Sequence, residues 1–129
     1  MLSVIQTNEP LGYSQAVRLG DVLHVSGQVG VDERGEVVGR GDVRAHVEQV
    51  FKNLRAVIEA GGSGLDLVAK LGVFSTSPDY LPVIREVRRQ VFGPIHHYSA
   101  STFLIVSGLA RPEYLVEIEA TYLVRGASA

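Results

Sequence analysis

The segment from Tyr114 to Val124 constrains the fold most, because its side chains alternate between two different environments. As an extended strand it would place only apolar side chains on one face, which suits packing beneath helices. The opposite face would combine Leu115 and Leu123 with two carboxylates, Glu117 and Glu119, about 6–7 Å apart. The residues on the apolar face are Val116, Ile118, Ala120, Tyr122 and Val124.

The mixed face of this strand suits neither a dry core nor open water. Carboxylates in an ordinary core would cost several kcal/mol unless they were paired. An open face would instead leave Leu115 and Leu123 in water. A subunit interface that contains polar pockets removes both problems, and we expect one here. The alternative is an exposed sheet face with two solvated glutamates.

Two amphipathic helices are predicted. The first begins after Asp42, whose carboxylate can accept free N–H groups of the first turn, and ends at Gly61-Gly62. The second is expected to be capped by Asp79, with Pro82 in its first turn, and to end at Gly93-Pro94. The apolar stripe of the first helix holds Val43, Val47, Val50, Phe51, Leu54, Val57 and Ile58. That of the second holds Tyr80, Val83, Ile84, Val87 and Val91.

Shorter apolar segments around these helices predict the other strands of a sheet. Gly20-Asp21 separates two of them and favours a hairpin. The order of strands, helix, strand, helix and strands predicts an α+β fold, in which a single mixed sheet carries both helices on one face. Besides the last strand, the expected segments are Ser3 to Thr7, Ala16 to Leu19, Val22 to Val25, Leu67 to Thr76 and Thr102 to Val106.

Length and composition limit the architecture. The 129 residues fit one domain spanning 1–129. The chain has no cysteine, which removes disulfides and thiol chemistry and favours a reducing compartment. No signal peptide and no stretch of ~18 apolar residues is found, so a cytoplasmic protein without a membrane span is expected.

Charge argues against a nucleic-acid partner. The formal net charge is −2, whereas nucleic-acid binders usually carry a basic excess. The basic cluster of Arg85, Arg88 and Arg89 is interpreted as a solvated helix face.

The four histidines lack metal-ligand spacing, so no metal site is predicted. His24 is interpreted as a core or interface residue, and His46 is expected on the surface of the first helix. His96 and His97 precede a strand, in a loop position where functional side chains often lie. A structural role for these two remains equally open.

Several sequence blocks resemble the RidA (YjgF) family. They are Gly12-Tyr13-Ser14-Gln15-Ala16-Val17, Leu23-His24-Val25-Ser26-Gly27-Gln28, Val50-Phe51-Lys52-Asn53-Leu54 and Glu117-Ile118-Glu119-Ala120. The resemblance implies a chorismate-mutase-like fold and a homotrimer with ligand sites in three inter-subunit clefts. It also implies deamination of reactive imines and enamines such as 2-aminoacrylate, without a metal or an organic cofactor.

Two departures from the family pattern bear on activity. Deaminating members carry an arginine before a Ser or Thr at the start of the penultimate strand, and Ser101 stands there, followed by Thr102. A guanidinium grips a carboxylate through two charge-assisted hydrogen bonds, whereas a hydroxyl offers one neutral bond. The loss would weaken anchoring of the substrate by about 1.5–3 kcal/mol. The family's frequent asparagine falls on Ile84.

The resemblance assigns roles to the remaining residues. Glu117, a catalytic candidate together with Ser101, would orient or deprotonate a water molecule. Tyr13 would close the cleft, and Ser26 and Gly27 would contact the ligand. His96 or His97 would replace the arginine as carboxylate partner, and Thr102 would line the cleft.

Two functions are therefore expected as alternatives. The first is a deaminase or related hydrolase acting on imines, enamines or related amino-unsaturated acids. The second is a non-catalytic trimer that binds a small metabolite. The charge balance disfavours a third reading, the family's older endoribonuclease label.

Overall fold

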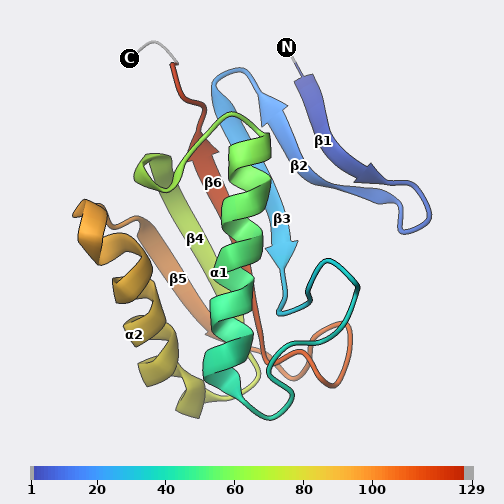
Figure 1. Cartoon of the computed structure of the whole chain (residues 1–129), viewed down its shortest axis with the longest axis vertical. Helices are drawn as coiled ribbons and strands as arrows, with labels where there is room; N and C mark the ends of the chain where they lie inside the picture. The colour runs from blue at the N-terminus through green and yellow to red at the C-terminus, as the bar shows by residue number, and fades with distance from the viewer. Residues whose placement is uncertain (1, 127–129) are drawn as a thin grey trace.

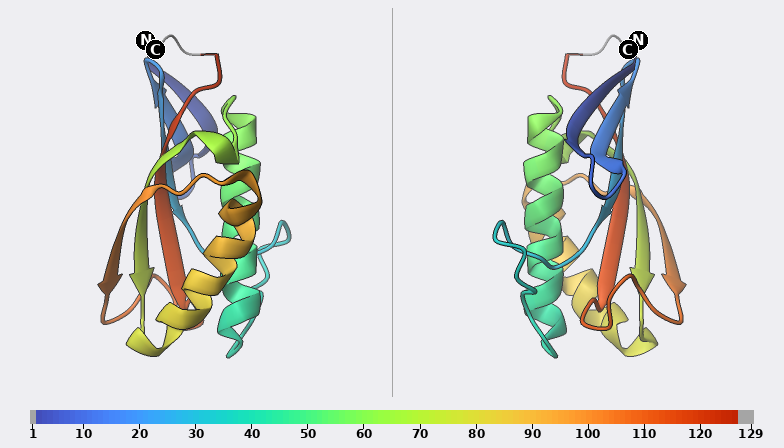
Figure 2. Two further views of the ribbon diagram at one scale, coloured as in Figure 1. Left: turned by 90° about the vertical axis from the view of Figure 1, so that its left-hand side faces the viewer. Right: turned by 90° about the vertical axis from the view of Figure 1, so that its right-hand side faces the viewer.

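A computed structural model describes residues 2–126. Its six strands form one sheet in the order β1-β2-β3-β6-β4-β5, with both helices on the same face (Figures 1 and 2). β4 and β5 are parallel and the other neighbouring strands are antiparallel, so the predicted mixed α+β sheet is confirmed. The strands are β1 (Leu2–Asn8), β2 (Tyr13–Leu19), β3 (Val22–Gln28), β4 (Val68–Ser75), β5 (Ala100–Ile105) and β6 (Val116–Leu123). The helices are α1 (Val43–Ala60) and α2 (Leu81–Phe92).

The hairpin between β2 and β3 turns at Gly20, whose φ of 62° lies in the region that glycine adopts without steric penalty. Leu19 pairs with Val22 across this turn, as the sequence predicts. β3 extends beyond the expected end at Val25 and runs to Gln28, with a shift of register against β6 between these two residues. This irregularity includes Gly27.

The core lies between the sheet and the two helices. All five residues of the apolar face predicted for the last strand are buried, as is most of the α1 stripe. Phe51 of α1 and Phe92 of α2 meet edge to face, with ring centroids 6.0 Å apart. No helix in the described part of the chain is long and apolar enough to cross a membrane.

The two helices begin differently. Asp42 caps α1, since its side chain accepts a hydrogen bond from the N–H of Ala45 at 3.2 Å. The prediction that Asp79 caps α2 is wrong. Pro78 begins a short 3-10 turn instead, in which the Asp79 N–H donates to Ser77 Oγ at 3.1 Å, so Asp79 precedes the helix without capping it.

The expected surface position of His46 is also wrong, because its side chain is fully buried. Nδ1 donates to the carbonyl of Val38 at 3.0 Å. Nε2 accepts the N–H groups of Gly30 and Leu115, each at 3.3 Å. The imidazole therefore joins the loop after β3 to the segment before β6, and its polar atoms are satisfied in the core.

Candidate functional site

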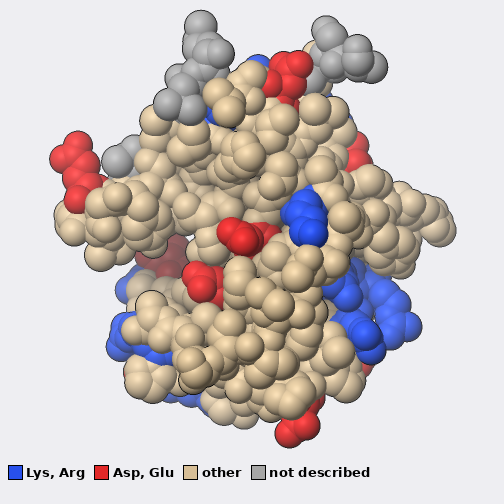
Figure 3. Space-filling view, turned by 180° about the vertical axis from the view of Figure 1, so that it is seen from behind, with Lys and Arg blue, Asp and Glu red and all other residues tan. Residues whose placement is uncertain are grey.

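The face of the sheet opposite the helices, called the open face below, carries the two glutamates of β6. Glu117 and Glu119 point to this face because the alternate residues of β6 are buried beneath the helices. Figure 3 views the molecule from this side and shows a few charged side chains within a mostly uncharged surface. The open face thus combines carboxylates with mostly uncharged surroundings, among them the exposed Leu123. Leu115, expected on the same face, precedes β6 and packs against the core instead.

Each glutamate lies over a glycine of a neighbouring strand. A Cβ built on Gly27 of β3 would stand 2.5 Å from Oε1 of Glu117. A Cβ built on Gly72 of β4 would stand 2.9 Å from Cγ of Glu119. Any larger residue at position 27 or 72 would therefore force the carboxylate above it to move.

The surroundings of Glu117 favour the protonated form of its carboxyl. Its side chain is about half-buried, and burial raises the pKa of its carboxyl, as does the negative charge of Glu119. A carboxyl whose pKa moves towards neutrality can take a proton from water and return it later. No hydrogen bond or ion pair within the described residues fixes the Glu117 carboxylate.

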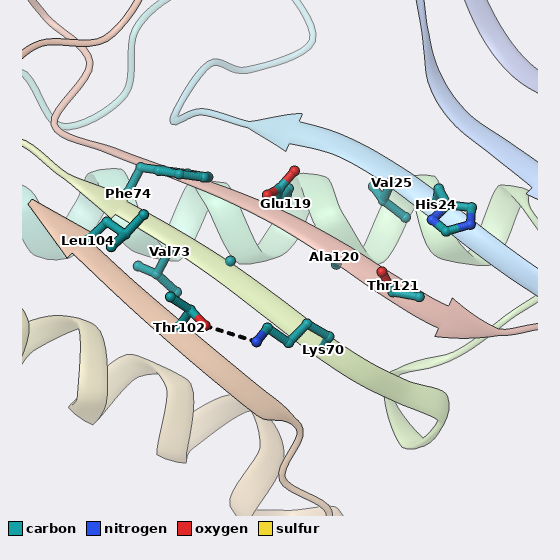
Figure 4. Close-up of a pocket in the computed structure, with 11 residues that line it drawn as sticks. His24, Val25, Lys70, Val73, Phe74, Thr102, Leu104, Glu119, Ala120 and Thr121 are labelled. Carbon is teal, nitrogen blue, oxygen red and sulfur yellow. Dashed lines mark hydrogen bonds between the residues drawn. The ribbon is translucent and has the colours of Figure 1, made fainter. Parts of the chain in front are cut away.

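A pocket of about 380 Å³ lies beside Glu119 on the open face (Figure 4). Polar side chains from four strands line it, and Phe74 and Leu104 form its apolar wall. Lys70 Nζ donates a hydrogen bond to Thr102 Oγ1 at 2.8 Å, drawn as a dashed line in Figure 4. The polar lining residues are His24, Lys70, Thr102, Glu119 and Thr121.

Two of these lining residues, Lys70 and His24, are not predicted from the sequence as site residues. Lys70 alternates with the buried Leu71 and Val73 along β4, so its period places it on the face of the glutamates. His24, interpreted as core or interface, is exposed on this open face. Strand alternation is enough to predict on which face of its own strand each of these two side chains lies. Only the sheet order shows that β3, β4 and β6 lie together.

Thr102 and Ser101 lie on opposite faces of β5. Thr102 pairs with Gly72 and lines the open-face pocket. Ser101 pairs with Leu71, which is fully buried, and its hydroxyl accepts a hydrogen bond from Arg88 Nη1 of α2 at 3.0 Å. The structure therefore brings Thr102, and not Ser101, onto the face of Glu117.

Tyr13 and Gly27 both line a second, open groove of about 720 Å³ beside the β1–β2 hairpin and α1. The Tyr13 ring is exposed, at the beginning of β2. Ser26, the neighbour of Gly27, donates its hydroxyl hydrogen to the carbonyl of Ser14 at 2.6 Å, which leaves its lone pairs for a ligand.

The two adjacent histidines lie outside both hollows. His96 is exposed and has a left-handed backbone, with φ 51°. His97 Nε2 donates to the carbonyl of Val68 at 2.8 Å, so its ring braces the beginning of β4. Ile84, at the family's asparagine position, is fully buried in the core. Within residues 2–126 no group of three or more His, Cys, Asp or Glu is placed to hold a metal ion.

Comparison with known proteins adds independent information. A "2-iminobutanoate/2-iminopropanoate deaminase" of Dermatophagoides farinae is 35% identical over 85 residues, which are 65% of this chain and 66% of that protein. A RutC family protein of Pyrococcus horikoshii is 35% identical over 114 residues, 87% of each chain. The crystal structure of RidA from an Antarctic Psychrobacter superposes with a TM-score of 0.81 at 35% identity, covering 88% of this chain and 89% of that one.

The family model described as "Endoribonuclease L-PSP" matches residues 6–124, nearly the whole of the described fold. The matched range contains Glu117 and Glu119 with the glycines that they lie over, the β2–β3 hairpin and both helices. On this match, and on relatives that cover most of its length, the chain belongs to the RidA (YjgF) family.

Proposed function

We propose that this protein hydrolyses small 2-imino acids, and the enamines that tautomerise to them, to 2-oxo acids and ammonia. The half-buried Glu117 carboxyl with its raised pKa is the observation that carries the proposal. The named activity of the mite relative supports the choice of substrate class.

The proposed reaction uses one water molecule and balances without an oxidant. The Glu117 carboxylate accepts a proton while water oxygen bonds to the imine carbon, giving a tetrahedral carbinolamine. The same carboxyl returns this proton to the nitrogen, and then takes the remaining hydroxyl proton and passes it to the nitrogen as well, so that the carbon–nitrogen bond breaks, ammonia leaves and the carbonyl forms. A raised pKa suits Glu117 to both transfers, because its two protonation states become closer in free energy at neutral pH.

The other candidates receive roles that follow from their positions. Tyr13 would close the groove that Gly27 lines, and Ser26 would accept a hydrogen bond from the substrate. Thr102 would contact substrate on the open face, whereas Ser101 would act only from the edge of β5. His96 and His97 lie outside both hollows, so a contact with the substrate carboxylate would require His96 to move or His97 to leave Val68.

We propose further that the open face is covered by other copies in a homotrimer, with ligand clefts between subunits. Four apolar side chains on it, Val4, Leu19, Leu104 and Leu123, are between 40% and 56% exposed. An apolar surface of this kind marks an interaction site. Light scattering at micromolar concentration is expected to give three times the chain mass, and a monomer mass would contradict the trimer.

The deaminase proposal is tested by ammonia release from freshly generated 2-aminoacrylate and 2-iminobutanoate, with Glu117→Gln as the comparison. The wild-type protein is expected to release ammonia faster than buffer, and the variant to match buffer. Release at the buffer rate by the wild-type protein would contradict the proposal. Calorimetric binding of 2-oxobutanoate by such an inactive protein would favour the alternative of a metabolite-binding trimer.

A further inference from the structure

The open-face pocket holds one positive and one negative side chain without a partner of opposite charge. Neither Lys70 nor Glu119 lies within 4.0 Å of an opposite charge among the described residues. Both side chains are exposed, and both line the same pocket (Figure 4). We infer that this pocket binds a small α-amino acid as a zwitterion, with the carboxylate at Lys70 and the ammonium group at Glu119.

The register of the sheet fixes the spacing of the two charges. Glu119 pairs directly with Gly72, and Lys70 is two residues along the same strand, opposite Thr121. Such diagonal neighbours have α-carbons about 7–8 Å apart, a distance that long side chains can span. Lys70 instead turns towards Thr102, away from the glutamate. The gap accommodates a ligand that offers each side chain a charge-assisted hydrogen bond of about 2.8 Å.

Two neighbouring groups favour this arrangement: Gly72 lies beneath the Glu119 carboxylate, and the Thr102 hydroxyl lies beside the Lys70 ammonium group. Gly72 allows Glu119 to lie close against β4, at the edge of the pocket. Thr102 Oγ1 accepts from Lys70, so its own O–H remains available to donate to a bound carboxylate. A carboxylate at this end would therefore meet a cation and a hydroxyl donor together.

The apolar wall of the pocket favours a ligand with an apolar side chain. Phe74 and Leu104 line the pocket beside the charged residues, and the volume of about 380 Å³ suits a small molecule. A short aliphatic side chain would cover this wall and remove its apolar surface from water. The inferred ligand class is thus a small aliphatic amino acid.

The lining of this pocket includes Glu119 but not Glu117. Glu117 pairs with Phe74, four residues from Lys70 along β4, which is about 13 Å of extended strand between their α-carbons. The amino-acid pocket therefore borders the proposed deaminase site and shares Thr102 with it, but binding of an amino acid by Lys70 and Glu119 requires no reaction at Glu117.

Isothermal titration calorimetry of the full chain tests the inference with three matched probes: L-2-aminobutanoate, butanoate, which lacks the ammonium group, and 1-propylamine, which lacks the carboxylate. We expect the zwitterion to bind at least tenfold more tightly than either single-charge probe. Lys70→Met and Glu119→Gln are each expected to weaken its binding at least tenfold. Lys52→Met, which removes an exposed lysine on α1, is the control and should leave binding unchanged.

The same preparations are examined by light scattering, because a neighbouring copy offers the other way to neutralise these charges. A lower mass for both Lys70→Met and Glu119→Gln, together with no binding of the zwitterion, would show that the two residues pair between copies and would overturn the inference. Equal binding of butanoate and L-2-aminobutanoate, or no binding of any probe, would also overturn it. Ammonia release is measured separately, so absence of turnover leaves the binding result interpretable.

Discussion

Oε1 of Glu117 lies 2.5 Å from the place where a Cβ on Gly27 would stand. Gly27→Ala is therefore expected to displace the carboxylate and to lower imine deamination at least tenfold, because small misplacements of a reacting group reduce rates strongly. The unfolding free energy should change by less than about 1 kcal/mol, since the carboxylate is the flexible end of its side chain. Steady-state ammonia release and chemical denaturation measure the two effects.

Gly108→Ala is the matched control for this experiment. A Cβ at position 108 would meet no atom within 4 Å, so we expect wild-type activity and stability. Full activity in Gly27→Ala would show that the position of the Glu117 carboxylate does not matter for turnover.

The raised pKa of Glu117 predicts how Glu117→Gln affects stability at different pH values. Because the pKa is higher in the folded state, the folded protein favours the protonated carboxyl, and this contribution is lost as pH rises through the folded pKa. The variant should match the wild-type melting temperature near pH 4 and exceed it slightly at pH 7, while turnover is abolished. A melting temperature lower than that of the wild type at pH 7, with loss of oligomer mass, would instead assign Glu117 to assembly.

The buried imidazole of His46 predicts sensitivity to acid. Burial lowers the pKa of His46, so the neutral ring stabilises the fold above the unfolded-state pKa of about 6.5. That stability is lost as pH falls below this value towards the folded pKa, by up to about 1.4 kcal/mol per pH unit. Denaturant unfolding at pH values from 7.5 to 5, in steps of about 0.5 pH unit, measures the slope of the unfolding free energy against pH.

His46→Gln should flatten this acid slope and lower stability at neutral pH by about 1–3 kcal/mol, because the bonds to Val38, Gly30 and Leu115 are not all replaced. His96→Gln, at an exposed position, should keep the wild-type slope. An unchanged slope in His46→Gln would assign the acid sensitivity to another group.

An arginine added to β5 is expected to act at position 102 and not at position 101. Ser101→Arg would meet Arg88, whose pKa is already lowered by burial and by Arg85 and Arg89. Thr102→Arg would instead place a guanidinium on the face of the glutamates, where it can hold a substrate carboxylate. We expect Thr102→Arg to raise kcat/KM for 2-iminobutanoate about tenfold or more, and Ser101→Arg to leave it unchanged. A larger increase of kcat/KM in Ser101→Arg than in Thr102→Arg would show that the side chain at position 101 points towards the substrate.

Much of the fold follows from the order of apolar residues along the chain. The alternation of β6 predicts its buried face, and the steps of three and four residues predict α1 from Asp42 to Gly61. These patterns are local, because a strand repeats every two residues and a helix every 3.6. The same alternation also indicates that Glu117 and Glu119 share an uncovered face.

Only the tertiary structure decides which residues meet on that face. The sheet order places β3 and β4 on either side of β6, which brings Gly27 beneath Glu117 and Gly72 beneath Glu119. It also sets Thr102 beside Lys70, a contact between residues 32 positions apart. The burial of His46 also depends on tertiary structure, because the N–H groups of Gly30 and Leu115 that donate to its ring come from distant parts of the chain. Periodicity determines which way a side chain points, but strand order and register determine its neighbours, and both depend on contacts remote in sequence.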